Sequence, residues 1–294
     1  MDSGQSSARA HARAGDVRVS CFDKTMSLSS SDVDVVCSAP GKIILFGEHS
    51  VVHGRPAVAA SAGGALRCYA RVQTVRSTQS SAPARVTLQL DSFGVSIEWL
   101  VSDLRTQLLL DDRTGCLAEN ATSSCSTAGA TSCPRLVDGE LREALGSAAD
   151  AAVRSLADGE SVREAVLAFL FLFGSIWCER AATGTAAEGD MHVQIWSTLP
   201  VGAGMGSSAS YSVALAAALL QAAEGKASIR PTVVPSAAGE PGSVALRTAA
   251  NKWAFECERL FHGSPSGIDN TVCSLGKICR SARARSLPTN RSGV

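Results

Sequence analysis

Hydrophobic and polar positions alternate through much of the first 100 residues, and then recur at three- and four-residue steps. The alternation over 66–75 and 84–90, with short apolar runs at 35–36, 42–46 and 95–99, predicts strands. The spacing becomes helical from residue 141 and predicts helices over 162–173, 211–223 and 250–261, with one more strand over 192–197. The chain therefore combines strands and helices.

Four segments have no period of either kind. Residues 1–34 are polar and Ser-rich and predict a disordered extension, and 111–138 and 225–243 predict loops. The segment 277–294 holds five basic residues and no acid, so we interpret it as a solvated tail, with a basic targeting segment as the alternative. The intervening 35–276 is predicted to be the folded domain, with 111–138 as a loop insertion.

Composition narrows the class of protein. The hydrophobic fraction of 45% supports a core, and 27 basic against 27 acidic residues argue against nucleic acid or an anionic membrane as a partner. The ten cysteines include no CxxC pair and predict reduced thiols. The most apolar run, 165–178, is shorter than the ~20 residues of a membrane span. We expect a soluble, intracellular protein that acts on a small molecule.

The glycine-rich segment 200–209, PVGAGMGSSA, lies between a predicted strand and a predicted buried helix. Alternating glycines let backbone N–H groups approach an anion, and the following helix adds the positive end of its dipole. The spacing fits neither the Walker A motif nor the dinucleotide fingerprint. Phosphate binding is one interpretation, and a tight turn with a serine cap is the other.

Two further clusters carry charged residues. Lys42 opens an apolar strand in APGKIILFGEH (39–49), where it could bind a phosphate or protect a sheet edge. Glu258 and Asp269 lie in ECERLFHGSPSGIDN (256–270). They could be a magnesium ligand and a base near Lys42, or a surface charge and a helix cap. Spacing alone does not decide between these interpretations.

Taken together, three segments resemble the GHMP small-molecule kinases. They are SAPGKIILFGEHSVVHG (38–54), PVGAGMGSSASYSVALAAALL (200–220) and NKWAFECERLFHGSPSGIDN (251–270), and within the superfamily they are most similar to the mevalonate kinase family. The resemblance implies an α+β fold, with the GHMP N-terminal domain (ribosomal protein S5 domain 2-like, a mixed sheet with packed helices). It also implies ATP-dependent phosphorylation of the C5 hydroxyl of mevalonate, early in isoprenoid and sterol biosynthesis.

The resemblance also implies a role for each matching residue. Asp269 would be the catalytic base, and Lys42 would contact the transferring phosphate and favour the ionised carboxylate. Glu48, His49 and Asp269 would form the substrate site, and Ser208 and Glu258 would hold Mg²⁺. The remaining ATP contacts would be Ser92, Ser197, Gly202, Ala203, Gly204, Met205, Gly206, Ser207 and Ser208.

The similarity stops near residue 276, whereas the family continues into a C-terminal ferredoxin-like domain. We therefore expect that domain to be largely missing and activity to be impaired. The alternatives are another GHMP kinase, or a truncated non-catalytic nucleotide-binding protein. The family resemblance is compatible with a homodimer. We expect a cytoplasmic location, with the peroxisome as the alternative, although the chain ends in Ser-Gly-Val rather than a peroxisomal signal.

Overall fold

The computed structural model describes residues 18–21, 33–48, 56–76, 83–108, 137–156, 159–178, 189–200, 203–225, 228–233, 241–263, 265–276 and 279–281. A seven-stranded mixed sheet forms the base of this part of the chain, in the order β1-β7-β6-β8-β5-β2-β9. Its strands are β1 (Arg18–Cys21), β2 (Val33–Pro40), β5 (Arg67–Arg76), β6 (Arg85–Leu90), β7 (Val95–Leu100), β8 (Gly189–Ser197) and β9 (Ser228–Val233). The pairs β6–β8 and β2–β9 are parallel, and the other neighbours are antiparallel.

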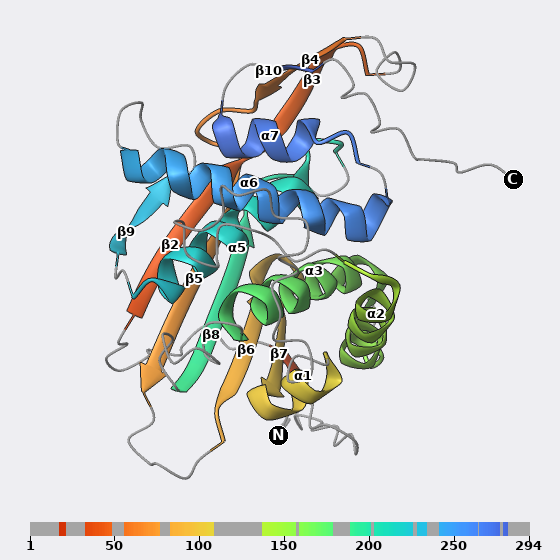
Figure 1. Cartoon of the computed structure of the whole chain (residues 1–294), viewed down its shortest axis with the longest axis vertical. Helices are drawn as coiled ribbons and strands as arrows, with labels where there is room; N and C mark the ends of the chain where they lie inside the picture. Colours follow the sequence, from red (N-terminus) through yellow and green to blue (C-terminus); the bar gives the residue numbers. More distant parts are fainter. Residues whose placement is uncertain are drawn as a thin grey trace, which may run out of the picture.

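Helices cover one face of this sheet (Figure 1). They are α1 (Val101–Gln107), α2 (Gly139–Val153), α3 (Gly159–Leu172), α5 (Ser207–Ala223), α6 (Pro241–His262) and α7 (Ile268–Leu275), and a π-helical segment, Phe173–Cys178, continues α3. The central helix α5 packs against β2 and β5 on one side and against α6 on another. Nearly all of its side chains are buried, as its apolar composition predicts.

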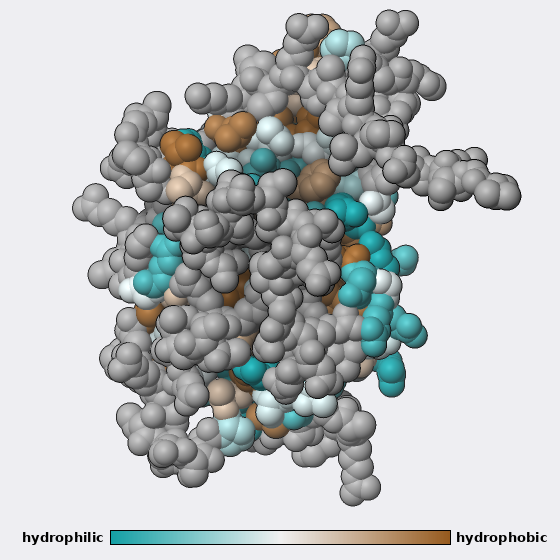
Figure 2. Space-filling model, in the orientation of Figure 1, coloured by the Kyte–Doolittle hydropathy of each residue, from teal (hydrophilic) through white to brown (hydrophobic). Residues whose placement is uncertain are grey.

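A small sheet stands apart from the large one, in the order β10-β4-β3. It contains β3 (Lys42–Phe46), β4 (Ala57–Ser61) and β10 (Cys279–Ser281), and α7 packs on it through Ile268 and Val272. On β3, Ile43, Leu45 and Phe46 are exposed, and Figure 2 shows apolar surface in this upper region of the molecule.

Several predictions of irregular structure are wrong. Arg18–Cys21 of the segment 1–34 pairs with β7, and Cys279–Ser281 of the tail pairs with β4. In the predicted loop 225–243, Ser228–Val233 adds to β2 as a parallel strand, and α6 already begins at Pro241. These short strands gain hydrogen bonds from partners distant in sequence, which local composition does not reveal. Residues 111–136 of the predicted insertion lie outside the described residues.

The apolar run 165–178 lies in α3 and the π-helical segment, in the core between other elements. Among the described residues, no helix combines the length and apolar character that a membrane crossing needs. The buried cysteines Cys37, Cys68, Cys178, Cys257 and Cys273 are free thiols, in agreement with the sequence prediction.

Candidate active site

The described part of the glycine-rich segment, 203–206, forms a turn directly before α5. Gly204 and Gly206 have φ angles of 67° and 66°, in the left-handed region that favours glycine. Gly206 directly precedes α5, and its carbonyl accepts a hydrogen bond from the Ser210 N–H at 2.9 Å. Ala203, Gly204 and Ser207 are exposed, so this turn presents its backbone and the start of α5 to solvent.

Two hydrogen bonds join this turn and the first turn of α5 to the start of β3 and the end of β2. The Lys42 N–H donates to the Met205 carbonyl at 2.9 Å, and the Ser210 hydroxyl donates to the Ala39 carbonyl at 2.7 Å. Gly206 lies directly against the Lys42 side chain, since a Cβ atom added there would be 2.7 Å from Lys42 Cγ. The positions of the glycine turn and of the lysine are therefore coupled.

Lys42 forms an ion pair that joins β3 to α7. Its Nζ lies 3.1 Å from Oδ2 of Asp269, and the lysine is 7% exposed. Asp269 lies in the first turn of α7, which begins after Gly267, where φ is 73°. The N-cap position is thus occupied by Gly267, so the interpretation of Asp269 as a helix cap is wrong and its carboxylate faces Lys42 instead.

Glu258 is the second carboxyl group of this region, on the buried face of α6. It is 5% exposed, which excludes the interpretation as a surface charge. Burial raises its pKa to about 7, the negative charge of Asp269 adds to this rise, and Lys42 opposes it. The three charged groups therefore lie within Coulomb range of one another, although they come from β3, α6 and α7.

A cavity of about 350 Å³ opens between the sheet and the helices α3, α5 and α6. Four predicted ATP contacts line it, namely Ser92, Ser197, Ser207 and Ser208. Its other lining residues are Cys68, Leu90, Phe93, Glu164, Ala165, Ile195, Leu199, Tyr211 and Phe261. A mostly apolar cavity of this size with a few polar groups is typical of a small-molecule site.

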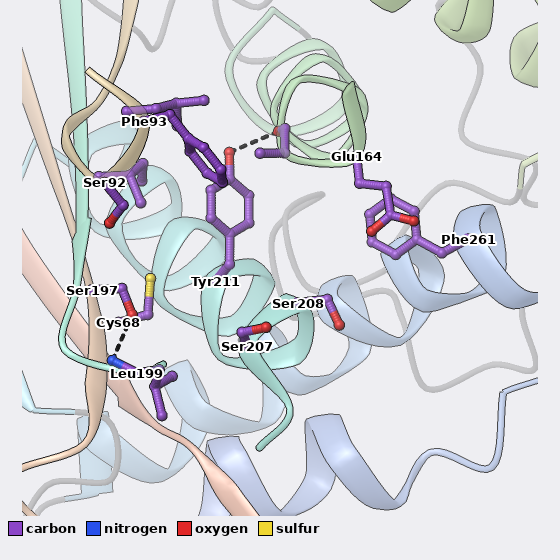
Figure 3. A pocket seen from close by; sticks show the side chains of 13 residues that line it. Cys68, Ser92, Phe93, Glu164, Ser197, Leu199, Ser207, Ser208, Tyr211 and Phe261 are labelled. Atoms are coloured by element: carbon purple, nitrogen blue, oxygen red, sulfur yellow. Dashed lines mark hydrogen bonds between the residues drawn. The ribbon is translucent and has the colours of Figure 1, made fainter. Parts of the chain in front are cut away.

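Tyr211 forms a wall of this cavity (Figure 3). Its hydroxyl donates to the Ala165 carbonyl at 2.8 Å, and burial raises the pKa of the phenol well above its usual value. Figure 3 shows Glu164 and Phe261 on one side of the ring and Ser92 and Phe93 on the other. The sequence analysis missed these aromatic residues and Glu164, because nothing in their spacing distinguishes them from core residues.

Of the remaining predicted site residues Glu48, His49 and Gly202, the structure describes only Glu48. Glu48 is exposed beyond the far end of β3. Four steps of about 3.3 Å place Phe46 roughly 13 Å from Lys42, and Glu48 lies further along the chain. The substrate role of Glu48 stays a prediction. His49 and Gly202 lie outside the described residues.

Comparison with protein-family models finds a match over part of the chain. Residues 171–277 match the model described as GHMP kinases N terminal domain. The match spans the glycine turn, Glu258 and Asp269.

Curated relatives are mevalonate kinases. The chain is 39% identical to the mevalonate kinase of Bos taurus over 246 residues, which is 84% of this chain and 53% of that protein. It is 36% identical to the mevalonate kinase of Homo sapiens over 251 residues, again 84% of this chain and 53% of that protein. The chain thus spans about half the length of the curated relatives it matches.

Among solved structures, the crystal structure of the Methanococcus jannaschii mevalonate kinase is 15% identical. It covers 85% of this chain and 53% of that chain, with a TM-score of 0.46.

Proposed function

We propose that the chain transfers the γ-phosphoryl group of ATP to the C5 hydroxyl of mevalonate. The observation that carries this proposal is the Lys42–Asp269 ion pair of 3.1 Å, with the lysine side chain against Gly206 of the glycine turn. A phosphate-binding turn, a cation and a carboxylate are thereby adjacent. Phosphoryl transfer depends chiefly on alignment and charge neutralisation, and this combination provides both.

In this proposal the nucleoside of ATP occupies the cavity beside Tyr211, with contacts to Ser92 and Ser197. The phosphates bind along the predicted contacts 202–208, where the positive end of the α5 dipole favours anions. Lys42 neutralises charge on the γ-phosphate. The oxygen of the substrate hydroxyl bonds to the γ-phosphorus while the bond between that phosphorus and the ADP oxygen breaks. Asp269 accepts the proton that the hydroxyl loses.

The proposed magnesium ligands are Ser208 and Glu258. No group of three or more His, Cys, Asp or Glu that could hold a metal is found among the described residues. Mg²⁺ suits such a site, because it commonly binds one or two carboxylates, waters and substrate phosphates rather than a complete protein cage. Bound with ATP, the ion would neutralise phosphate charge, and its own charge would favour the ionised form of Glu258.

The proposal includes the cellular location of the reaction. Free buried thiols at Cys37, Cys68 and Cys257 support a reducing compartment, and we propose the cytoplasm. Homodimer formation stays a prediction, as do the substrate roles of Glu48 and His49.

The test is phosphate transfer from ATP by the purified chain, with mevalonate, galactose, homoserine and phosphomevalonate offered separately. We expect 5-phosphomevalonate as the product, identified by mass spectrometry, and its loss in the variant Asp269→Asn. Transfer only to another alcohol would identify a different GHMP kinase. ATP binding without transfer to any of the four would support a non-catalytic nucleotide-binding protein.

A further inference from the structure

Two asparagines at opposite ends of the motif 251–270 are hydrogen-bonded to each other. Asn251 lies on α6 and Asn270 in the first turn of α7. The Asn270 Nδ2 donates to Oδ1 of Asn251 at 2.5 Å and to the Asn251 carbonyl at 3.2 Å. Asn270 is 2% exposed, so water does not compete freely for these bonds. Asn270 thus ties α7 to α6.

The two helices joined by this pair carry the two acidic residues of the candidate site. Asn270 directly follows Asp269 on α7. Asn251 precedes Glu258 by seven residues on α6, and seven residues make almost two full turns, so both face the same side of the helix. The asparagine pair therefore sets the spacing of the two helices near both carboxyl groups.

Stability alone does not account for an asparagine at position 270. Its Oδ1 is buried without a hydrogen-bond partner among the described residues, and leaving such an atom unpaired opposes folding. Both asparagines also line a second cavity of about 360 Å³, together with Phe255, Ser266 and other residues of α6 and α7. Packing is incomplete beside Asn270, so its hydrogen bonds add a restraint on the first turn of α7 to the one that Ile268 provides on the small sheet.

We propose that Asn270 is a positioning residue, which acts with Asn251 to hold the Asp269 carboxylate against the Lys42 ammonium group. The geometric part of this inference concerns the ion pair alone. The consequence for catalysis rests on the proposed function.

The geometric part is tested by unfolding equilibria in urea, without any turnover. Lys42→Met, Asp269→Asn and the double variant are measured in the parent chain and again with Asn270→Ala. In the parent, we expect the two changes to be non-additive by roughly three- to tenfold in the unfolding constant. With Asn270→Ala this factor falls to about one, because Asp269 no longer remains at Lys42.

A purely structural Asn270 would weaken all four proteins equally and leave the coupling intact, which would overturn the proposal. Thr271→Ala is the matched control, since Thr271 lines the same cavity and should leave the coupling unchanged. If Asn270→Ala does not fold, Asn251→Leu replaces it. That variant removes the shorter of the two hydrogen bonds, and a fully retained coupling there would equally overturn the proposal.

The catalytic part is tested with two variants of similar size at position 251. Asn251→Asp retains a side-chain acceptor for Asn270 Nδ2, whereas Asn251→Leu leaves only the backbone carbonyl of residue 251. We expect Asn251→Leu to lower kcat roughly ten- to hundredfold with little change in the KM for ATP, and Asn251→Asp to restore most of it. Equal kcat values for the two variants would contradict the catalytic part. A parent without phosphate transfer would instead refute the proposed function, while the coupling measurement still decides the geometric part.

Discussion

Replacing Gly206 with alanine perturbs the candidate site at a single carbon atom. The added Cβ would be 2.7 Å from Lys42 Cγ and 3.3 Å from Lys42 Cε. Lys42 is 7% exposed and paired with Asp269, so its side chain has little room to move without losing that ion pair. We expect Gly206→Ala to displace Lys42 from Asp269 and to distort the turn before α5.

The expected loss in the free energy of unfolding has two parts. The backbone at Gly206 has φ of 66°, and a residue with a Cβ in this region costs about 1–2 kcal/mol. The close approach to Lys42 adds the cost of overpacking, about 1–3 kcal/mol. The free energy of unfolding should therefore fall by about 2–5 kcal/mol in Gly206→Ala.

Gly225 provides a matched control at the other end of α5. Its φ is 67°, and a Cβ added there would meet nothing within 4 Å. Gly225→Ala should therefore show the backbone cost alone, about 1–2 kcal/mol, with unchanged ATP affinity. Urea unfolding and titration calorimetry with Mg²⁺-ATP measure both quantities for the two variants.

The difference between the two variants isolates the contact with Lys42. We expect Gly206→Ala to be the less stable variant and to bind ATP at least tenfold more weakly than Gly225→Ala. Equal stability and equal ATP affinity would refute the reasoning, because the lysine would then not depend on the shape of the turn.

Three other variants test neighbouring parts of the account. Folding raises the pKa of Glu258 from 4.5 to about 7, so between these pH values the folded chain holds a proton that the unfolded chain has lost. Without ligand, the free energy of unfolding should therefore fall as the pH rises from 4.5 to about 7. Urea unfolding at a series of pH values should show a fall of about 3 kcal/mol, and Glu258→Gln should abolish it. If the free energy of unfolding of the variant still falls with pH, Glu258 is not the cause. Asp269→Asn should lower the rate of phosphate transfer roughly 10²–10⁴-fold while ATP binding in calorimetry stays within a few-fold, and a rate close to that of the parent would exclude Asp269 as the base. Ser210→Ala removes the 2.7 Å bond to the Ala39 carbonyl and should lower the free energy of unfolding by about 1–3 kcal/mol in urea, whereas no change would show that this bond contributes nothing.

Local pattern was sufficient to predict the elements that carry the site. Strand alternation predicted β5 and β6, a short apolar run predicted β7, and helical spacing predicted α3, α5 and the C-terminal half of α6. The resemblance to the GHMP kinases implied that Asp269 lies near Lys42, and the two side chains form an ion pair of 3.1 Å. The predicted strands and helices depend on short-range periodicity, whereas spacing alone left the role of Asp269 open.

Features that depend on distant partners were not predicted. The strands β1, β9 and β10 form only because β7, β2 and β4 offer free edges, and their own sequences are polar or contain proline and serine. The aromatic walls of the cavity, Phe93, Tyr211 and Phe261, come from three elements whose packing no spacing rule reveals. The bond between Asn251 and Asn270 likewise spans two helices.

Hydrogen exchange with and without Mg²⁺-ATP is the most direct test of the central claim, that the turn before α5 binds the phosphates of ATP beside Lys42 and Asp269. We expect saturating nucleotide to slow exchange of the backbone amides in 203–210 and in the segments that line the cavity. Unchanged exchange at 203–210 under conditions where ATP is bound would contradict the account, because the nucleotide would then lie elsewhere.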